Sequence, residues 1–278
     1  MTMLSPQTPA ASKPVLNGDW PFYLCLGLLG GAYLILIVAM LAADLFFTTP
    51  DHLLGALQSP EIKYAIKLSL ISCSITAILS LWVAVPLGYL LARTQFRGRL
   101  LVDTLLDIPI VLPPLVIGLS LLILFQTQIG KFFEEHVLTV TYAVPSVILA
   151  QFSVAAAFAV RTMRVTFEQI PARNEQVAMT LGCTRAQAFW RITMNEARRG
   201  LLTAFTLSWA RSLGEFGPIL IFSGATRLRT EVLPTTVFLE LSVGRIEAAI
   251  AVSLLMIGVA VIVLILTRTL GLRGTGLV

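Results

Sequence analysis

The stretch NEQVAMTLGCTRAQAFWRIT (residues 174–193) differs from the sequence on either side of it. It is polar and helix-prone, one glycine interrupts it, and it lies between two long apolar runs. The segment before Gly182 begins with Pro171, which suits a first helical position, and glycine commonly follows the end of a helix. Thr184 and Gln187 then have the spacing of a capping box. The pattern predicts two short helices joined by a tight glycine turn.

Each of the two predicted helices has an apolar face, because apolar residues recur at helical spacing. The first face is formed by Val177, Ala178 and Leu181, and the second by Ala186, Phe189 and Ile192. Such faces need cover, either from the ends of neighbouring helices or from a partner protein. The periodicity alone leaves both interpretations open.

The composition of the whole chain indicates a membrane protein. Of its 278 residues 56% are hydrophobic and 13% are charged, whereas an ordinary soluble domain has about 25% charged residues. Six apolar runs reach the roughly 20 residues that a membrane-spanning helix needs. They are residues 22–43, 68–92, 104–125, 142–160, 201–222 and 248–267. We therefore predict an all-α membrane protein with six transmembrane helices.

The first run is expected to stay in the mature protein, because its apolar core exceeds the ~7–15 residues of a signal peptide. Residues 1–21, with several prolines and glycines and no apolar period, are expected to form a disordered cytoplasmic tail. Residues 22–278 are then one six-span domain, and residues 161–200 are its longest loop.

The lysines and arginines predict the orientation, since cytoplasmic loops carry an excess of them. Most of the 20 lie in one alternate set of segments, namely the N-terminal tail, residues 93–103, residues 161–200 and the tail from Arg268. The other set carries fewer basic residues and most of the acids. Both termini and the loop of residues 161–200 are therefore predicted to be cytoplasmic. The net charge of +5 is explained by these loops, so no nucleic acid partner is expected.

The loop resembles the cytoplasmic coupling loop of ABC-importer permeases, whose pattern is roughly E-A-A-x3-G-x9-I-x-L-P. With Gly182 as the anchor, Ile192 falls ten residues on, as the pattern requires, and Ala178 takes the second alanine position. Gln176 stands at the glutamate position, with Glu175 one residue early. Val177 replaces the first alanine, and Met194-Asn195 replaces Leu-Pro.

This resemblance implies the fold of a type I ABC importer permease, whose coupling loop fits into a cleft of a cytoplasmic ATPase. Either Glu175 or Gln176 is expected to meet the ATPase. The residues implied in ATPase coupling are Glu175, Gln176, Val177, Ala178, Leu181, Gly182, Thr184 and Ile192.

The chain contains no phosphate loop of the G-x4-G-K-[ST] type, so ATP hydrolysis is expected from a separate subunit. We expect no enzyme activity and no cofactor in this chain, with ATP and Mg²⁺ used by the partner ATPase. The three cysteines have no metal or disulfide spacing, there is no HExxH motif, and His52 and His136 lie in predicted outer loops. A metal site is therefore not expected.

Three charged residues lie within the predicted spans. Inserting each into a membrane costs roughly 2.5–3.5 kcal/mol on insertion scales, so each is expected to have a structural partner or a function. Asp107 is expected to bind a nearby arginine such as Arg97 or Arg99. Arg211 and Glu215 have i, i+4 spacing and can pair along a helix. Either the pair only neutralises itself, or Arg211 attracts an anion and Glu215 gates the path.

Prolines 109, 113 and 114 remove backbone donors from the third run and force a kink or a break there. A broken helix in a membrane faces protein or a wet cavity, so this run is expected to border the pathway. Two stretches, DIPIVLPPLVIGLSLL (residues 107–122) and ARSLGEFGPILIFSG (residues 210–224), resemble the molybdate, tungstate and sulfate branch of these permeases. The candidate residues of the pathway or gate are Asp107, Pro113, Pro114, Arg211, Gly214, Glu215 and Gly217.

The resemblance implies two permease copies, which we expect to be identical, two ATPase copies and an extracytoplasmic binding protein, all at a bacterial or archaeal inner membrane. Molybdate or tungstate is the first expectation for the cargo, and sulfate, thiosulfate or another anion the second. An ion-coupled secondary transporter with Asp107 or Glu215 as its proton site is a further alternative, although it would need no docking loop. The outer loop of residues 223–247 is either a solvated loop or carries a small surface helix around residues 237–241.

Overall fold

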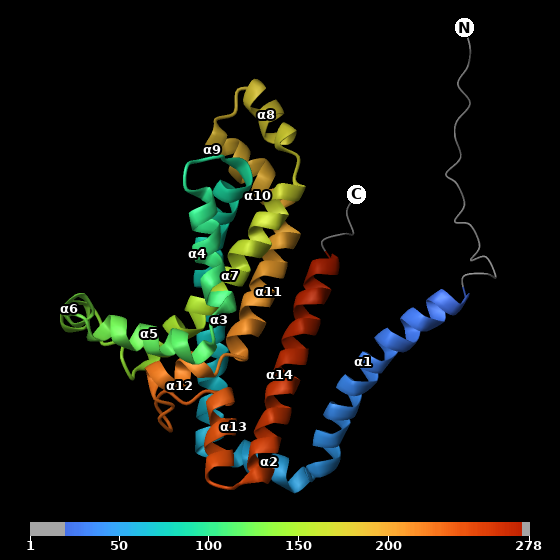
Figure 1. Ribbon diagram of the computed structural model, residues 1–278, viewed down its shortest axis with the longest axis vertical. Coiled ribbons are helices and arrows are strands. Elements are labelled where there is room, and N and C mark those ends of the chain that lie inside the picture. The colour runs from blue at the N-terminus through green and yellow to red at the C-terminus, as the bar shows by residue number, and fades with distance from the viewer. Residues whose placement is uncertain (1–19, 274–278) are drawn as a thin grey trace. The chain divides into compact units, whose positions relative to one another are not determined.

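The structure, a computed structural model, describes residues 20–273 of the chain (Figure 1). Every regular element in that part is a helix, which confirms the prediction of an all-α protein. The described residues divide into two units, one that ends at residue 49 and one that begins at residue 50. The expectation of a disordered N-terminal tail concerns residues that lie, apart from the last two, outside the described part.

The first unit holds α1 (Trp20–Phe47), a helix of 28 residues. Its sequence is apolar on every side, and Asp44 near its end is the one charged residue in it. At 1.5 Å per residue the helix is roughly 40 Å long, enough to cross the hydrocarbon core of a bilayer.

The second unit is a bundle around three helices that pack side by side (Figure 1). These are α3 (Pro60–Arg93), α7 (Val144–Gln169) and α11 (Arg198–Leu213). Around them lie α2 (Pro50–Gln58), α4 (Arg99–Val111), α5 (Pro114–Gln126), α6 (Gln128–His136), α12 (Gly217–Ser223), α13 (Leu233–Ser242) and α14 (Ile246–Arg273). The segment between α7 and α11 contains α8 (Ala172–Thr180), α9 (Arg185–Ala188), a π-helix (Phe189–Thr193) and α10 (Met194–Glu196).

Small residues let the central helices approach closely. A Cβ added to Gly88 of α3 would come within 2.9 Å of the Arg164 nitrogen in α7. Alanines such as Ala84 and Ala159 are fully buried in the same contact. In a membrane, where lipid tails are as apolar as leucine, such close packing replaces the hydrophobic effect as the main cause of helix association.

Four helices are long and apolar enough to cross a membrane, namely α1, α3, α7 and α14, and α4 with α5 make a fifth if that bent pair is one span. Two of the six runs are thus not single helices. Residues 104–125 are broken at Leu112 and Pro113 into α4 and α5, which meet at 112°. Residues 201–222 are broken at Gly214–Phe216 into α11 and α12. The proline break was predicted, whereas the second break was not.

Proline fixes the starts of several helices in the bundle. It stands in the first turn of α3, α5, α7, α12 and α13, where its missing N–H is no loss. At α3 the side chain of Ser59 also accepts a hydrogen bond from the Ile62 nitrogen at 3.3 Å. Of the two interpretations of residues 223–247, a solvated loop or a small helix around residues 237–241, the structure has the helix, as α13. It packs on α14 and α3 and buries Leu233 and Glu240.

Candidate functional site

The two-helix loop between α7 and α11 has the predicted turn. Gly182 has φ 93°, the left-handed region that glycine enters without strain. Its N–H donates to the Met179 carbonyl at 3.1 Å, and the Cys183 N–H donates to the Ala178 carbonyl at 3.1 Å. This pair of hydrogen bonds is a Schellman motif, which satisfies the carbonyls left free at the end of α8.

The capping box after the turn is also present. The Gln187 N–H donates to the Thr184 hydroxyl at 3.3 Å, and the Thr184 N–H donates to the Gln187 side chain at 2.9 Å. The second helix nevertheless differs from a plain α-helix, because α9 has four residues and continues into the π-helix. A π-turn inserts one extra residue and rotates the following side chains, so its position is not visible in a 3.6-residue pattern.

The predicted apolar faces are divided between the inside and the surface. Ala178 is buried, whereas Val177 and Leu181 are 49% and 81% exposed. Four residues apart, these two side chains are neighbours on one side of α8 and its end. On the second helix Phe189 is half-buried, while Trp190 is 66% exposed. We call Val177, Leu181 and Trp190 the exposed apolar residues of the loop, and within the chain they have little cover.

The other side chains expected to couple to an ATPase take distinct places. Gln176 and Thr184 are exposed, and Ile192 is half-buried. Glu175 is 7% exposed and faces the bundle. Its carboxylate accepts hydrogen bonds from the Tyr89 hydroxyl at 2.8 Å and the Thr193 hydroxyl at 2.7 Å.

Arg93 completes this cluster around Glu175. Its Nε donates to the carboxylate at 3.3 Å, and its terminal nitrogen donates to the Ile170 carbonyl at 2.8 Å. Of the two candidates at the glutamate position, Gln176 is the one at the surface. Sequence analysis did not single out Tyr89 or Thr193, since Tyr89 is 86 residues away from Glu175 and no periodic pattern links them.

Asp107 has a different partner from the one expected. The Arg161 guanidinium of α7 donates to both of its oxygens, at 2.8 and 2.5 Å. Arg99 was the wrong choice because eight residues of helix separate it from Asp107, a rise of about 12 Å. One turn away Asp103 pairs with Arg164 at 2.5 Å, and Arg99 at the start of α4 lies 4.0 Å from Glu168, so among the described residues three ion pairs join α4 to α7.

Arg211 and Glu215 form the expected pair, at 2.7 Å between Nη1 and Oε2. Glu215 lies just past the end of α11, in the break before α12, and is 1% exposed. The contact is an ion pair that lacks the alignment of a good hydrogen bond. The Arg211 side chain is 30% exposed, and its guanidinium lies 5.8 Å from the centre of the Phe158 ring. Arg211 thus keeps donors free on the side away from Glu215.

The proline and glycine candidates bring α5 and α12 together. A Cβ on Gly217 would meet Pro114 at 2.9 Å, and a Cβ on Gly118 would meet the Pro218 Cα at 2.7 Å. Each helix thus presents a glycine to the proline of the other. Pro113 lies in the break before α5. Gly214 differs from these residues, because an added Cβ would find its nearest neighbour at 3.9 Å.

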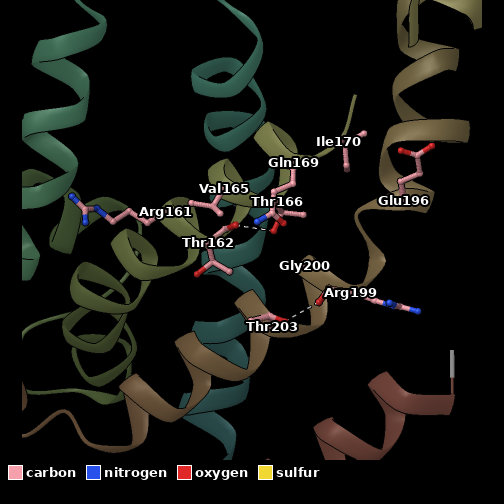
Figure 2. A pocket seen from close by; sticks show the side chains of 10 residues that line it. All are labelled: Arg161, Thr162, Val165, Thr166, Gln169, Ile170, Glu196, Arg199, Gly200 and Thr203. Atoms are coloured by element: carbon pink, nitrogen blue, oxygen red, sulfur yellow. Dashed lines mark hydrogen bonds between the residues drawn. The ribbon is translucent and has the colours of Figure 1, made fainter. Parts of the chain in front are cut away.

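A groove of about 720 Å³ lies between α7 and α11 beside the loop (Figure 2). Thr162, Thr166 and Thr203 are among the residues that line it, and each of their hydroxyls donates to a carbonyl one turn earlier in its own helix. Its charges are mixed, since Arg199 and the acid Glu196 lie at the same side in Figure 2. The sequence pattern missed this groove because α7 and α11 extend into residues that were assigned to the loop.

The segment before α13, together with α13 and the turn after it, holds a second set of charges. Arg227 donates to Glu240 at 2.8 Å, and Arg245 lies 3.7 Å from the same carboxylate. Glu231 is fully buried. Burial raises the pKa of the Glu231 carboxyl above its usual value, and the neighbouring Thr236 hydroxyl opposes this shift.

Comparison with known proteins agrees with this geometry. Residues 84–273 match the family model described as binding-protein-dependent transport system inner membrane component. The chain is 31% identical over 217 residues to the sulfate transport system permease protein CysT of Salmonella typhimurium, covering 77% of this chain and 78% of that one. It is 33% identical over 213 residues to the molybdenum transport system permease protein ModB of Mycobacterium tuberculosis, covering 75% and 80%.

A solved structure shares the fold. It is a bacterial alginate ABC transporter in complex with an alginate pentasaccharide-bound periplasmic protein. The TM-score is 0.75 at 18% identity, and the match covers 94% of this chain and 97% of that one. At this identity the likeness concerns the fold alone.

Proposed function

Because this chain belongs to the family of binding-protein-dependent transport system inner membrane components and is the permease of an ABC importer, we propose that it carries a tetrahedral oxyanion, with molybdate or tungstate as the first candidates. Its relatives include molybdate and sulfate permeases at about the same identity. Sulfate or thiosulfate is therefore the alternative cargo. An ion-coupled secondary transporter is the weaker alternative.

The observation that carries the proposal is the loop between α7 and α11. It presents Val177 and Leu181 outward on a helix that ends in a Schellman turn at Gly182. We assign this surface to the cleft of a separate cytoplasmic ATPase, which binds ATP and Mg²⁺. The assembly has two permease copies, which we take to be identical, two ATPase subunits and an extracytoplasmic binding protein.

The orientation and span count follow from the same assignment. The loop is cytoplasmic, and both termini lie on its side of the inner membrane, as the lysine and arginine distribution predicts. Six crossings then require that the broken segments, α4 with α5 and α11 with α12, each cross the bilayer. Broken helices are stable there only where they line protein or a wet cavity, so we place the pathway beside them.

Arg211 supports an anionic cargo. Its guanidinium has five N–H donors, and the pair with Glu215 leaves several of them for an oxyanion. We propose that loaded binding protein docks outside, ATP closes the ATPase dimer, and the loop moves the helices so that the pathway opens outward. ATP hydrolysis then returns it to the inward-open state. The chain supplies alternating access and no covalent chemistry.

The test is uptake by the complete complex in proteoliposomes, with binding protein outside and ATP inside. We expect ATP-dependent uptake of labelled molybdate, with unlabelled tungstate competing at equal concentration and sulfate competing only at more than about tenfold excess. Stronger competition by sulfate would replace molybdate with the alternative cargo. Uptake that follows a proton gradient and needs no ATP would favour the secondary transporter.

A further inference from the structure

The carboxylate of Glu175 lies where α8 meets three other elements of the bundle. It takes hydrogen bonds from Tyr89 at the end of α3 and from Thr193 in the π-helix. Arg93, also in α3, bonds both to this carboxylate and to the carbonyl of Ile170 just past α7. Glu175 thus connects α8 to the end of α3 and to the second half of the loop, and Arg93 extends the cluster to the residue that follows α7.

Two aromatic rings pack against Tyr89 beside this cluster, and the Glu175 side chain is 9% exposed. The Tyr89 ring lies edge-on to Phe189 at 4.7 Å and to Phe167 at 5.6 Å between centroids. Phe167 is fully buried, and Phe189 precedes Thr193 in the π-helix. Hydrogen bonds to a charged group are stronger in such surroundings, and their loss leaves that group unpaired at a high cost.

From these contacts we infer that Glu175 is a positioning residue, which fixes α8 to the end of α3 so that displacement of the loop moves the spans. This inference rests on the proposed function of the loop, but it assigns Glu175 a role inside the permease instead of at the ATPase surface. The residue that touches the ATPase at this point is then Gln176, which is exposed.

Another side-chain hydrogen bond of α8 shows why Glu175 differs from its neighbours. Asn174 donates to Glu196 at 2.8 Å, at an exposed position, and this bond joins α8 only to α10. It therefore links two parts of the loop and does not reach a long helix. Glu196→Gln is a matched control, because it also removes one loop carboxylate.

The experiment compares Glu175→Gln with the native complex of permease, ATPase and binding protein. We expect the variant to co-purify with the ATPase at the native ratio, because its exposed surface is unchanged. Molybdate moved per ATP hydrolysed should fall about tenfold, since a bond to a charged group contributes more than 1.4 kcal/mol. Glu196→Gln should keep the native ratio of transport to hydrolysis.

Two further variants keep the test valid if Glu175→Gln fails to fold. Tyr89→Phe and Thr193→Val each remove one donor to the carboxylate and preserve the shape of the side chain. Each should lower the transport per ATP by a smaller factor. Tyr89→Phe should lower the transport per ATP little further in a protein that already carries Glu175→Gln, because both residues act through the same contact between α8 and the end of α3, which we call the α8–α3 joint. An unchanged ratio in both single variants would overturn the inference, as would a Glu175→Gln protein that loses the ATPase.

A distance measurement separates this inference from the identity of the cargo. In the complex without native cysteines, spin labels at the exposed positions Leu90 in α3 and Thr180 in α8 report on the joint directly. In the native complex we expect one narrow distribution of distances between the two labels. In the Glu175→Gln complex we expect a broad one. Identical distributions in the two complexes would contradict the α8–α3 joint. If the distribution broadens in Glu175→Gln as expected but the native complex transports no molybdate, only the proposed cargo is contradicted.

Discussion

At the residue scale, Gly182 shows how far a sequence pattern reaches. The spacing from Pro171 to Thr184 predicted a helix end at this glycine, and its φ of 93° and the Schellman bonds confirm it. A helix end of this kind depends only on residues close together in the chain, so it can be predicted from the sequence. The partner of Asp107 was missed because it belongs to another helix, 54 residues away.

The first prediction concerns this turn. Nothing lies within 4 Å of a Cβ added to Gly182, so a substitution there is limited by φ alone. Gly182→Val should abolish ATP-coupled transport while membrane insertion stays intact, because a β-branched residue resists a positive φ. Gly182→Asn should retain most of the activity, since asparagine enters this region more readily. Equal transport by the valine and native proteins would disprove the assigned role of the turn.

The second prediction uses the buried carboxyl of Glu231. Because its pKa is raised in the folded state, the protein gains stability from it at low pH and loses that stability as pH rises through the folded-state pKa. Glu231→Gln should therefore raise the melting temperature of the detergent-solubilised protein at pH 8 by a few degrees. The difference should vanish well below the usual carboxyl pKa of 4.5, where the Glu231 carboxyl is protonated in both the folded and the unfolded state. A variant that is less stable at pH 8 would rule out this explanation.

At the scale of elements, the broken helices were partly predictable. The adjacent prolines 113 and 114 predicted the break between α4 and α5. The angle of 112° between the two helices was not predictable, because it depends on what α5 packs against. The break between α11 and α12 contains no proline, since Gly214, Glu215 and Phe216 fill it. The groove of Figure 2 arises from the junction of α7 and α11 and had no signature in either segment.

The third prediction tests the contact between α5 and α12. A Cβ at Gly118 would lie 2.7 Å from the Pro218 Cα, which is backbone and cannot rotate away. Gly118→Ala should therefore destabilise the folded permease by about 1–3 kcal/mol, as overpacking does. Gly258→Ala in α14, where no atom lies within 4 Å, is the control and should leave the melting temperature unchanged or higher. Equal melting temperatures for both variants would show that the two helices separate easily.

At the scale of the whole molecule, composition alone predicted a helical membrane protein, and this was confirmed. Hydropathy measures how apolar a run is and carries no information on where the run bends. It therefore predicted six uniform spans, whereas the described residues contain four long apolar helices and one bent pair. The segment between α7 and α11, which we propose as the coupling surface, was predicted as two short helices and a turn. Which of its apolar side chains face outward depended on the π-helix and on the cluster around Glu175.

The central claim is that the exposed side of α8, with Val177 and Leu181, binds a separate ATPase. The most direct measurement is co-purification from cells that express the tagged permease together with its neighbouring ATPase, in mild detergent. We predict stoichiometric recovery with the native chain and with Ile129→Asp, a control at an exposed apolar residue of α6. The double variant Val177→Asp with Leu181→Asp should lose the ATPase while the permease stays folded. An ATPase that binds the double variant as well as the native chain, or that never binds the native chain, would contradict the claim.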